Sequence, residues 1–264
     1  MKAIRYADET VYERTQRHNA LTRWLHSRRY RNVVSLLREL ARETPDRPIR
    51  VVEIGSAVSK LYDVLDPIAP IDYLGVELDG EFCRIARERH ARRSNFRVLQ
   101  GSASDPALDA ELGRPDLLCA LETLEHIPEH EVVRIVERMA RLQPRLLVCS
   151  GPIEIGPSIV IKNVGSLLVG YARAKNRPWR EVFWAGLYQL DRIPPHGTGH
   201  GGFDWRWLAQ TIRHNMRIRE IRKSPFTRLP AALSFSFMIV AEPRIAGERS
   251  AVSGAGLDAS RASR

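Results

Sequence analysis

The 264-residue sequence contains only three cysteines and no long run of apolar residues. Cys83, Cys119 and Cys149 form no Cys-x-x-Cys pair, and the last two lie in apolar, strand-like runs, so we expect buried thiols, as in a reducing compartment. No window holds the 18 or more apolar residues of a membrane span, and the N-terminus lacks the apolar core of a signal peptide. These absences predict a cytoplasmic protein without a membrane span.

The sequence is basic, with 41 Lys and Arg residues against 31 Asp and Glu residues, a net charge of +10 and a pI near 10.0. Such a charge favours polyanionic partners such as nucleic acid or anionic lipid. The arginines are scattered, however, and the aromatic residues that could stack on bases make up only 7% of the chain and cluster in apolar surroundings. Nucleic acid is therefore the less favoured partner, and the oligomeric state is left open.

The turn after the first apolar run, Arg50–Ile54, lacks both glycine motifs that cradle phosphates. This run instead carries Glu53 near its end, and a second apolar run ends in Glu77 about two dozen residues later. Glu53 would repel a pyrophosphate. Two carboxylates at the ends of neighbouring strands suit a cationic, phosphate-free nucleoside better.

Small residues follow Glu53 in the sequence. Gly55, Ser56 and Ala57 let the turn pass close to a ligand, because a bulky side chain there would fill the space that the ligand needs. Glu77 can accept hydrogen bonds from both hydroxyls of a ribose, and its charge strengthens them. The pattern predicts a βαβ unit that binds a nucleoside cofactor.

Four segments, in this order, resemble the signatures of class I S-adenosylmethionine-dependent methyltransferases. They are Glu-x-Gly-Ser-Ala-x-Ser at 53–59, Gly-Val-Glu-Leu-Asp at 75–79, Leu-Gln-Gly-Ser-Ala at 99–103 and Leu-Glu-Thr-Leu-Glu-His-Ile-Pro at 121–128. The resemblance covers roughly residues 48–242 and is to a superfamily rather than to one enzyme. It implies S-adenosyl-L-methionine as the cofactor.

The resemblance also implies a role for each matching position. Glu53 and Gly55 would face the methionine part of the cofactor, and Glu77 would face the ribose hydroxyls. Leu121 and Glu122, at the end of the fourth strand, would lie beside the sulfonium.

The resemblance also implies which residues lie around the adenine, and the sequence departs from the family pattern in two places. Leu78 would cover one face of the adenine, and Ser102 with Ala103 would lie at its edge. Ala57 and Ser59 stand where the family more often has glycine, and Ser102 stands where it often has aspartate. These departures leave open a non-catalytic, methyltransferase-like binding protein.

Short apolar strands alternate with helical segments from residue 48 onward. Strands are expected at 50–54, 72–77, 95–99, 115–120, 145–149, 216–223 and 233–241, and helices at about 58–66, 80–91, 129–141 and 205–215. We expect an α/β fold with a Rossmann-like, seven-stranded, mostly parallel sheet, helices on both faces and an antiparallel C-terminal hairpin.

The remaining segments are expected to surround this domain, 48–244. Residues 1–47 read as a helical extension that covers the sheet edge or the cofactor mouth. Residues 151–200 are too apolar and aromatic for a solvated loop, and they leave from the ligand-binding edge of the sheet, so we expect a helical lid that recognises the acceptor. The Gly-, Ala-, Ser- and Arg-rich tail, 245–264, is expected to be disordered.

Methyl transfer is an in-line displacement that often needs a base for the acceptor's proton. His200, in a glycine-rich run, and His126 and Glu122, after the fourth strand, are the candidates, since histidine titrates near neutrality. Glu122, Glu125, His126 and His200 also resemble the metal ligands of small-RNA 3′-terminal 2′-O-methyltransferases, although the segment after His200 has one extra residue and Asp204 in place of a glutamate. Two carboxylates and two imidazoles could hold a divalent metal ion.

The favoured function is O-methylation of a small-molecule, sugar-containing or lipid-linked acceptor, because the insertion 151–200 is mainly apolar and aromatic. Metal-dependent 2′-O-methylation of RNA is the first alternative. A non-catalytic binding protein is the second.

Overall fold

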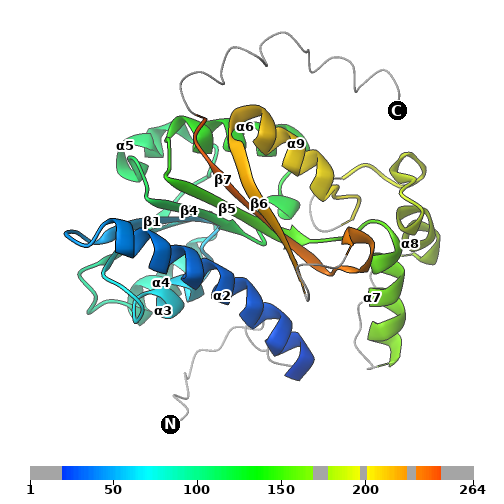
Figure 1. The fold of residues 1–264 in the computed structure, drawn as a ribbon, viewed down its shortest axis with the longest axis horizontal. Coiled ribbons are helices and arrows are strands. Elements are labelled where there is room, and N and C mark those ends of the chain that lie inside the picture. The colour runs from blue at the N-terminus through cyan, green and yellow to red at the C-terminus, as the bar shows by residue number, and fades with distance from the viewer. Residues whose placement is uncertain (1–19, 169–177, 197–200, 225–229, 245–264) are drawn as a thin grey trace.

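The computed structural model describes residues 20–168, 178–196, 201–224 and 230–244 (Figure 1). His200, parts of the expected lid and the tail 245–264 lie outside these residues, so the expectations for them stay predictions. No helix among the described residues is both long enough and apolar enough to cross a membrane.

One seven-stranded sheet forms the centre of the fold (Figure 1), with the strand order β3-β2-β1-β4-β5-β7-β6. Strands β1 to β5 are parallel, and β7 runs antiparallel to its neighbours β5 and β6. The predicted fold class is confirmed, and every predicted strand is present. The strands are β1 (Ile49–Ile54), β2 (Ile71–Glu77), β3 (Phe96–Gln100), β4 (Leu117–Leu121), β5 (Leu146–Pro152), β6 (Arg217–Ser224) and β7 (Ser236–Glu242).

The helices follow the predicted pattern and have identifiable starts. Asp79 caps α4 by accepting hydrogen bonds from the backbone N–H groups of Glu81 and Phe82, and Asp204 caps α9 through the N–H of Arg206. A short helix between β3 and β4, α5, was not predicted. The helices are α2 (Ala20–Glu43), α3 (Lys60–Leu65), α4 (Gly80–Arg89), α5 (Asp109–Leu112), α6 (Glu129–Arg141), α7 (Pro157–Leu168), α8 (Trp179–Gly186) and α9 (Trp205–Asn215).

Each face of the sheet has its own apolar core, because successive strand residues point to opposite faces. Val51 and the strand residues on the same face of the sheet pack with α2, α3 and α4. Val52 and the strand residues on the opposite face pack with α5, α6 and α9. Helix α2 contributes four fully buried side chains to the first core: Val33, Leu36, Leu37 and Leu40. Helix α2 therefore covers a face of the sheet and is part of the domain core.

Helices α7 and α8 lie between β5 and α9 in sequence and pack on each other at one side of the molecule (Figure 1). They have a small core of their own, formed by Ile159, Val182, Ala185 and Ile193. Because α7 begins five residues after the end of β5, the pair stands next to the carboxyl ends of the parallel strands.

Candidate active site

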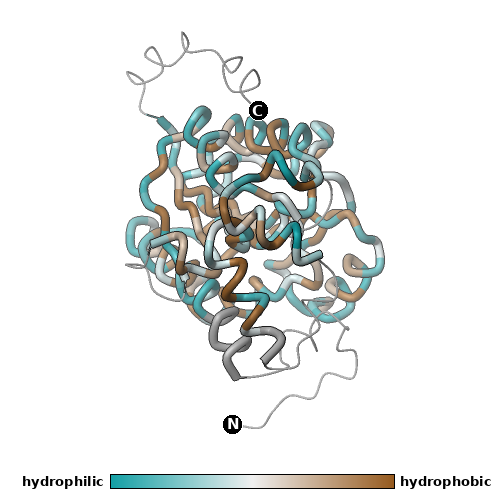
Figure 2. Tube along the Cα trace, turned by 90° about the vertical axis from the view of Figure 1, so that its right-hand side faces the viewer, coloured by the Kyte–Doolittle hydropathy of each residue, from teal (hydrophilic) through white to brown (hydrophobic). Residues whose placement is uncertain are grey.

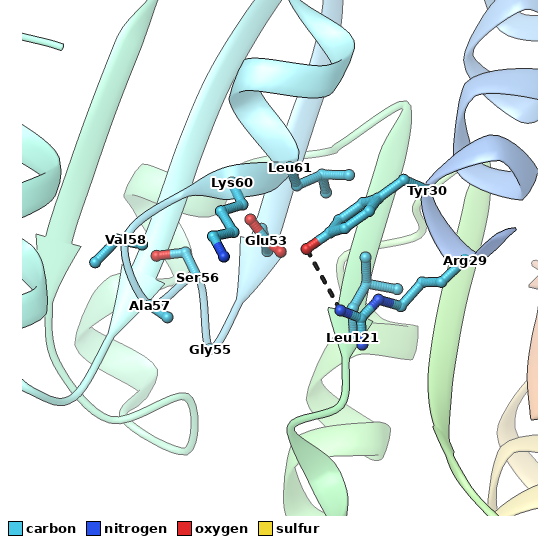
Figure 3. A pocket seen from close by; sticks show the side chains of 10 residues that line it. All are labelled: Arg29, Tyr30, Glu53, Gly55, Ser56, Ala57, Val58, Lys60, Leu61 and Leu121. Carbon is cyan, nitrogen blue, oxygen red and sulfur yellow. Dashed lines mark hydrogen bonds between the residues drawn. The ribbon is translucent and has the colours of Figure 1, made fainter. Parts of the chain in front are cut away.

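A cavity opens at the carboxyl ends of β1 and β4, the edge where ligands bind in open α/β sheets (Figure 3). Its volume is about 30 Å³, which is room for about two waters. A nucleoside can enter only if side chains at its mouth move. The lining residues are Arg29, Tyr30, Glu53, Gly55, Ser56, Ala57, Val58, Lys60, Leu61 and Leu121.

Glu53 lies deep in this cavity, with only 5% of its surface exposed. The Tyr73 hydroxyl donates a hydrogen bond to its carboxylate. Burial raises the pKa of Glu53 to about 8, while the Tyr73 hydrogen bond and the charge of Arg29 act in the opposite direction. A carboxylate in this state favours a cationic ligand, since a nearby positive charge lowers its pKa and ionises it.

Glu77, at the end of β2, fixes the backbone around the cavity. Its carboxylate accepts hydrogen bonds from the N–H of Ala57, at 2.7 Å, and from the N–H of Asp79, at 2.9 Å. The first bond ties the turn after β1 to the tip of β2. Each carboxylate oxygen has a second lone pair, so Glu77 can hold this turn and still accept bonds from ribose hydroxyls.

Gly55 has no space for a side chain, but the reason differs from the one expected. Its φ is +69°, and a Cβ built on it would lie 2.3 Å from Thr123 Cγ2. The Thr123 hydroxyl in turn donates to the carbonyl oxygens of Ile54 and Leu121, both at 3.2 Å. Gly55 therefore lets the ends of β1 and β4 approach each other, in addition to any contact with a cofactor.

Two positions in the turn after β1 hold a residue other than the expected glycine, yet their backbone has the conformation typical of glycine. Ala57 and Ser59 have φ values of +45° and +59°, in the left-handed region that glycine adopts without strain. An L-residue there costs roughly 1 kcal/mol. The sequence thus changes the residue type but not the path of the turn.

The expected adenine side is more open than the methionine side. Leu78 is 71% exposed directly after β2, as an apolar platform for a base would be. The hydroxyl of Ser102 lies 2.8 Å from that of Ser104 and accepts the N–H of Ser104 at 3.2 Å, so it stabilises its own loop. Arg138 of α6 anchors the same loop through the carbonyl oxygen of Ala103, at 2.6 Å.

Arg29 and Tyr30 of α2 were not predicted as site residues. Figure 3 shows both side chains reaching from α2 toward Glu53. Arg29 donates to the Tyr30 hydroxyl at 3.4 Å and pairs with Glu122 at 3.5 Å, and only 10% of its side chain is exposed. They lie four and three residues before buried Val33, so the periodicity of α2 places them on its sheet-facing side, but only the packing of α2 brings them to the cavity.

Glu122 does not line this cavity but lines a second hollow of about 20 Å³ beside β6 and β7, which Arg29 also lines. Glu122 has a φ of +55° and accepts a hydrogen bond from the Ser150 hydroxyl at 3.3 Å.

His126 is exposed. Partial desolvation lowers the pKa of His126, as does His196, whereas the charge of Glu122 raises it. At neutral pH the imidazole of His126 is therefore mainly neutral and can accept a proton.

The predicted metal ligands are not gathered within the described residues. Glu125 is fully buried, and burial raises its pKa well above the ordinary range. Its carboxylate lies on the side of Gly151, whereas neighbouring His126 is exposed. No group of three or more His, Cys, Asp and Glu side chains in the described part of the chain is arranged to hold a metal ion. His200 lies outside that part, so the metal hypothesis stays a prediction.

Comparison with known proteins decides the type of domain. The family model described as "Methyltransferase domain" matches residues 52–144, which include Glu53, Glu77 and the segment after β4. No curated protein matches the chain.

Residues 52–144 are therefore part of a methyltransferase domain.

Solved structures of methyltransferases share this fold at low sequence identity. Magnesium protoporphyrin IX methyltransferase (ChlM) from Synechocystis PCC 6803, with bound SAH, is 14% identical, with a TM-score of 0.54 over 90% of this chain and 91% of that one. The methyltransferase domain of bacterial CtHen1-C is 15% identical, with a TM-score of 0.55 over 84% of this chain and 100% of that one. The CurJ carbon methyltransferase is 15% identical, with a TM-score of 0.59 over 89% of this chain and 59% of that one.

The residues of the methyltransferase site fit its cofactor, S-adenosylmethionine. Glu53 offers a buried carboxylate to a cationic group, and Glu77 stands at the strand end expected for ribose recognition. Among the described residues, the Ser56 hydroxyl is buried and makes no hydrogen bond, although it lines the cavity. A buried hydroxyl without a partner is costly, so a ligand that hydrogen-bonds to Ser56 would be stabilised there.

Proposed function

We propose that this methyltransferase methylates a hydroxyl oxygen on a small-molecule, sugar-containing or lipid-linked acceptor. When bound, S-adenosylmethionine supplies an electrophilic methyl group on its sulfonium. The protein must hold the acceptor oxygen in line with that methyl group and remove its proton.

The observation that carries this proposal is the position of the exposed His126 imidazole, which follows Glu122 just after the end of β4 and whose pKa is lowered by partial desolvation. A hydroxyl is a weak nucleophile until it loses its proton, and a neutral imidazole is a suitable base. The charge of Glu122 favours protonated His126 and so stabilises the imidazolium that proton transfer produces. In this proposal His126 is the general base and Glu122 supports it.

The apolar character of α7 and α8 supports an amphiphilic acceptor. These helices leave from the same edge of the sheet, and most of their exposed large side chains are apolar or aromatic. A binding surface of this kind favours an acceptor with an apolar portion over a bare phosphate backbone.

The test measures release of S-adenosylhomocysteine with a panel of hydroxylated acceptors and with short RNAs, with and without a chelator. We expect turnover of an amphiphilic or sugar-containing acceptor that the chelator does not affect. His126→Gln should lower kcat about 100-fold or more and leave cofactor affinity unchanged. His130→Gln, a histidine on α6 whose side chain is 67% exposed, is the matched control and should keep full activity.

Two results would refute the proposal. Full activity of His126→Gln would remove His126 as the base. Turnover of RNA alone, lost with the chelator, would replace the proposal with metal-dependent 2′-O-methylation of RNA.

A further inference from the structure

The cavity at the carboxyl ends of β1 and β4 is lined by charged side chains of both signs. Glu53 is the acid, and Arg29 and Lys60 are basic. Figure 3 shows Arg29 entering from α2 and Lys60 lying at the start of α3, with Glu53 between them in this view. The two cations would repel a group that carries only positive charge, so the lining favours a group that carries charges of both signs.

Arg29 is set apart by its burial. Hydrophilic, teal stretches occur along the described chain between hydrophobic, brown ones (Figure 2), so hydropathy alone does not single out this arginine. Only 10% of its side chain is exposed, however. Burial raises the pKa of Glu53, and the charge of Arg29 opposes this rise. Arg29 therefore lies close enough to Glu53 for both to bind the same ligand group.

Two contacts of Arg29 with neighbouring side chains are long. Its guanidinium lies 3.4 Å from the Tyr30 hydroxyl and 3.5 Å from the carboxylate of Glu122, which does not line the cavity. Charge-assisted hydrogen bonds of a guanidinium are usually about 2.7 to 2.9 Å long, and a carboxylate can accept two of them side by side. A carboxylate in the cavity would therefore give Arg29 shorter bonds than these two contacts.

Two hydroxyl groups in the cavity lining can complete a carboxylate site. The Ser56 hydroxyl is buried, and within the described part of the chain it makes no hydrogen bond. Burial raises the pKa of the Tyr30 hydroxyl, so this group keeps its proton at neutral pH and can donate a hydrogen bond to an anion. Ser56 and Tyr30 thus add neutral donors to the charge of Arg29.

The methionine part of S-adenosylmethionine carries both charges that this lining favours. It is an α-amino acid, so an ammonium group and a carboxylate are bonded to the same carbon atom. A site that binds such a group needs an acid and a cation close together, and Glu53 and Arg29 provide them. Glu53 lies within the matched family segment, 52–144, whereas Arg29 lies before it.

We propose that Arg29 binds the carboxylate of the cofactor's methionine part, with the Tyr30 and Ser56 hydroxyls as further donors. Glu53 binds the neighbouring ammonium group. Helix α2 therefore makes the site specific for a cofactor that carries a complete amino acid portion. This recognition does not depend on the methyl acceptor, so it can fail while the proposed reaction stands.

Calorimetric titration tests this with three ligands: S-adenosylhomocysteine, its decarboxylated analogue, which keeps the amine, and methylthioadenosine, which lacks the amino acid portion. Wild-type protein should bind S-adenosylhomocysteine at least about tenfold more tightly than the decarboxylated analogue, because only the former offers a carboxylate to Arg29. Arg29→Gln should weaken binding of S-adenosylhomocysteine at least about tenfold and should not weaken binding of the other two ligands. Arg29→Lys should restore part of the loss, since it keeps the charge but not the planar fork.

Arg31→Gln is the matched control, because it removes an equal charge from an exposed position on the same helix. This variant should bind all three ligands as the wild type does. Equal losses for S-adenosylhomocysteine and methylthioadenosine in Arg29→Gln would show that Arg29 only supports the packing of α2, and would overturn the proposal. Wild-type protein that binds S-adenosylhomocysteine and its decarboxylated analogue equally well would also overturn it. If Lys60→Gln abolished the discrimination and Arg29→Gln kept it, the carboxylate would be bound by Lys60 instead.

Discussion

Asp116, at the amino end of β4, and Glu53, at the carboxyl end of β1, are buried acidic side chains on neighbouring parallel strands. Asp116 accepts two hydrogen bonds from Arg47, at 2.6 and 2.8 Å, and one from the N–H of Arg50, at 2.9 Å. Arg145 adds a second positive charge at 3.5 Å. Burial alone would raise the pKa of Asp116, but these partners outweigh it and hold the pKa below its ordinary value.

Within the part of the chain that the structure describes, Glu53 has no comparable set of fixed partners. The Tyr73 hydroxyl, which is neutral, donates a hydrogen bond to the Glu53 carboxylate. Arg29 acts on Glu53 through its charge, and burial raises the pKa of Glu53 to about 8. The amino ends of the strands are thus neutralised within the protein, whereas the carboxyl ends carry a carboxyl group that a cationic ligand would ionise. The difference shows which edge is built for stability and which for binding.

The largest expected effect comes from a pair of glycines at the two edges. Gly55 and Gly113 both have positive φ values, but a Cβ on Gly113 would meet nothing closer than Arg50 Nη2, at 3.6 Å. Gly113→Ala should therefore cost only the backbone strain, on the order of 1 to 3 kcal/mol, because its φ of +56° and ψ of −146° are adopted almost only by glycine. Gly55→Ala adds the collision with Thr123 to the strain of its own φ and should lose more unfolding free energy, about 4 kcal/mol. Gly55→Val should abolish cofactor binding.

Urea unfolding and calorimetry with S-adenosylhomocysteine measure these losses. Equal destabilisation by the two alanine variants would show that the Thr123 contact is unimportant.

The second prediction compares the two ends of β2. Glu77→Ala should weaken cofactor binding by roughly 1.5 to 3 kcal/mol, since it removes a charged hydrogen-bond acceptor and releases the N–H of Ala57. Asp72, which pairs with Arg50 at 2.9 Å near the other end of the strand, is the control, and Asp72→Ala should leave cofactor affinity unchanged. Calorimetric titration gives both values. Similar affinity for wild type and Glu77→Ala would mean that Glu77 has no part in cofactor recognition.

The third prediction compares the pH dependence of stability at the two buried acids. The folded pKa of Glu53 lies above its ordinary value of 4.5, so the stability linked to its protonation is present at pH 4.5 and is lost as the pH rises toward 8. Glu53→Gln should therefore gain stability relative to wild type with rising pH. The pKa of Asp116 is lowered from 3.8, so its stabilisation is present above that pH and is lost on acidification. Asp116→Asn should lose about 2 kcal/mol at pH 7, and less in acid.

Thermal unfolding of the three proteins from pH 4 to 9 tests this contrast. Groups that titrate in all three proteins cancel in the differences. Parallel pH profiles for Glu53→Gln and Asp116→Asn would contradict the distinction between the two edges.

Much of the cofactor side could be predicted because its signals are local. A segment of about 25 residues contains the two apolar strands that end in Glu53 and Glu77 and the small-residue turn between them, so this unit can be predicted from local sequence. The contact between Gly55 and Thr123 was not readable, since it joins residues 68 positions apart and depends on β1 lying beside β4. Arg29 was missed for the same reason: only the packing of α2 on the sheet brings it to Glu122.

On the acceptor side, the sequence could not predict which side chains are buried and which are exposed. Glu125 and His126 are adjacent in sequence, yet the first is fully buried and the second exposed. No pattern in Glu-x-x-Glu-His-Ile-Pro specifies this, because the segment forms one turn of 3₁₀ helix, Leu124–His126, whose direction is set by the elements around it.

The sequence by itself determined the order of strands and helices, the methyltransferase signatures and the carboxylates at two strand ends, because hydrophobic periodicity and turn chemistry act over short distances. Only the tertiary structure decided which carboxyl groups are neutralised, which side chain of α2 enters the site and which face of α8 remains exposed. Those outcomes depend on burial and charge pairing between segments far apart in the chain, and only the packed fold brings these segments together.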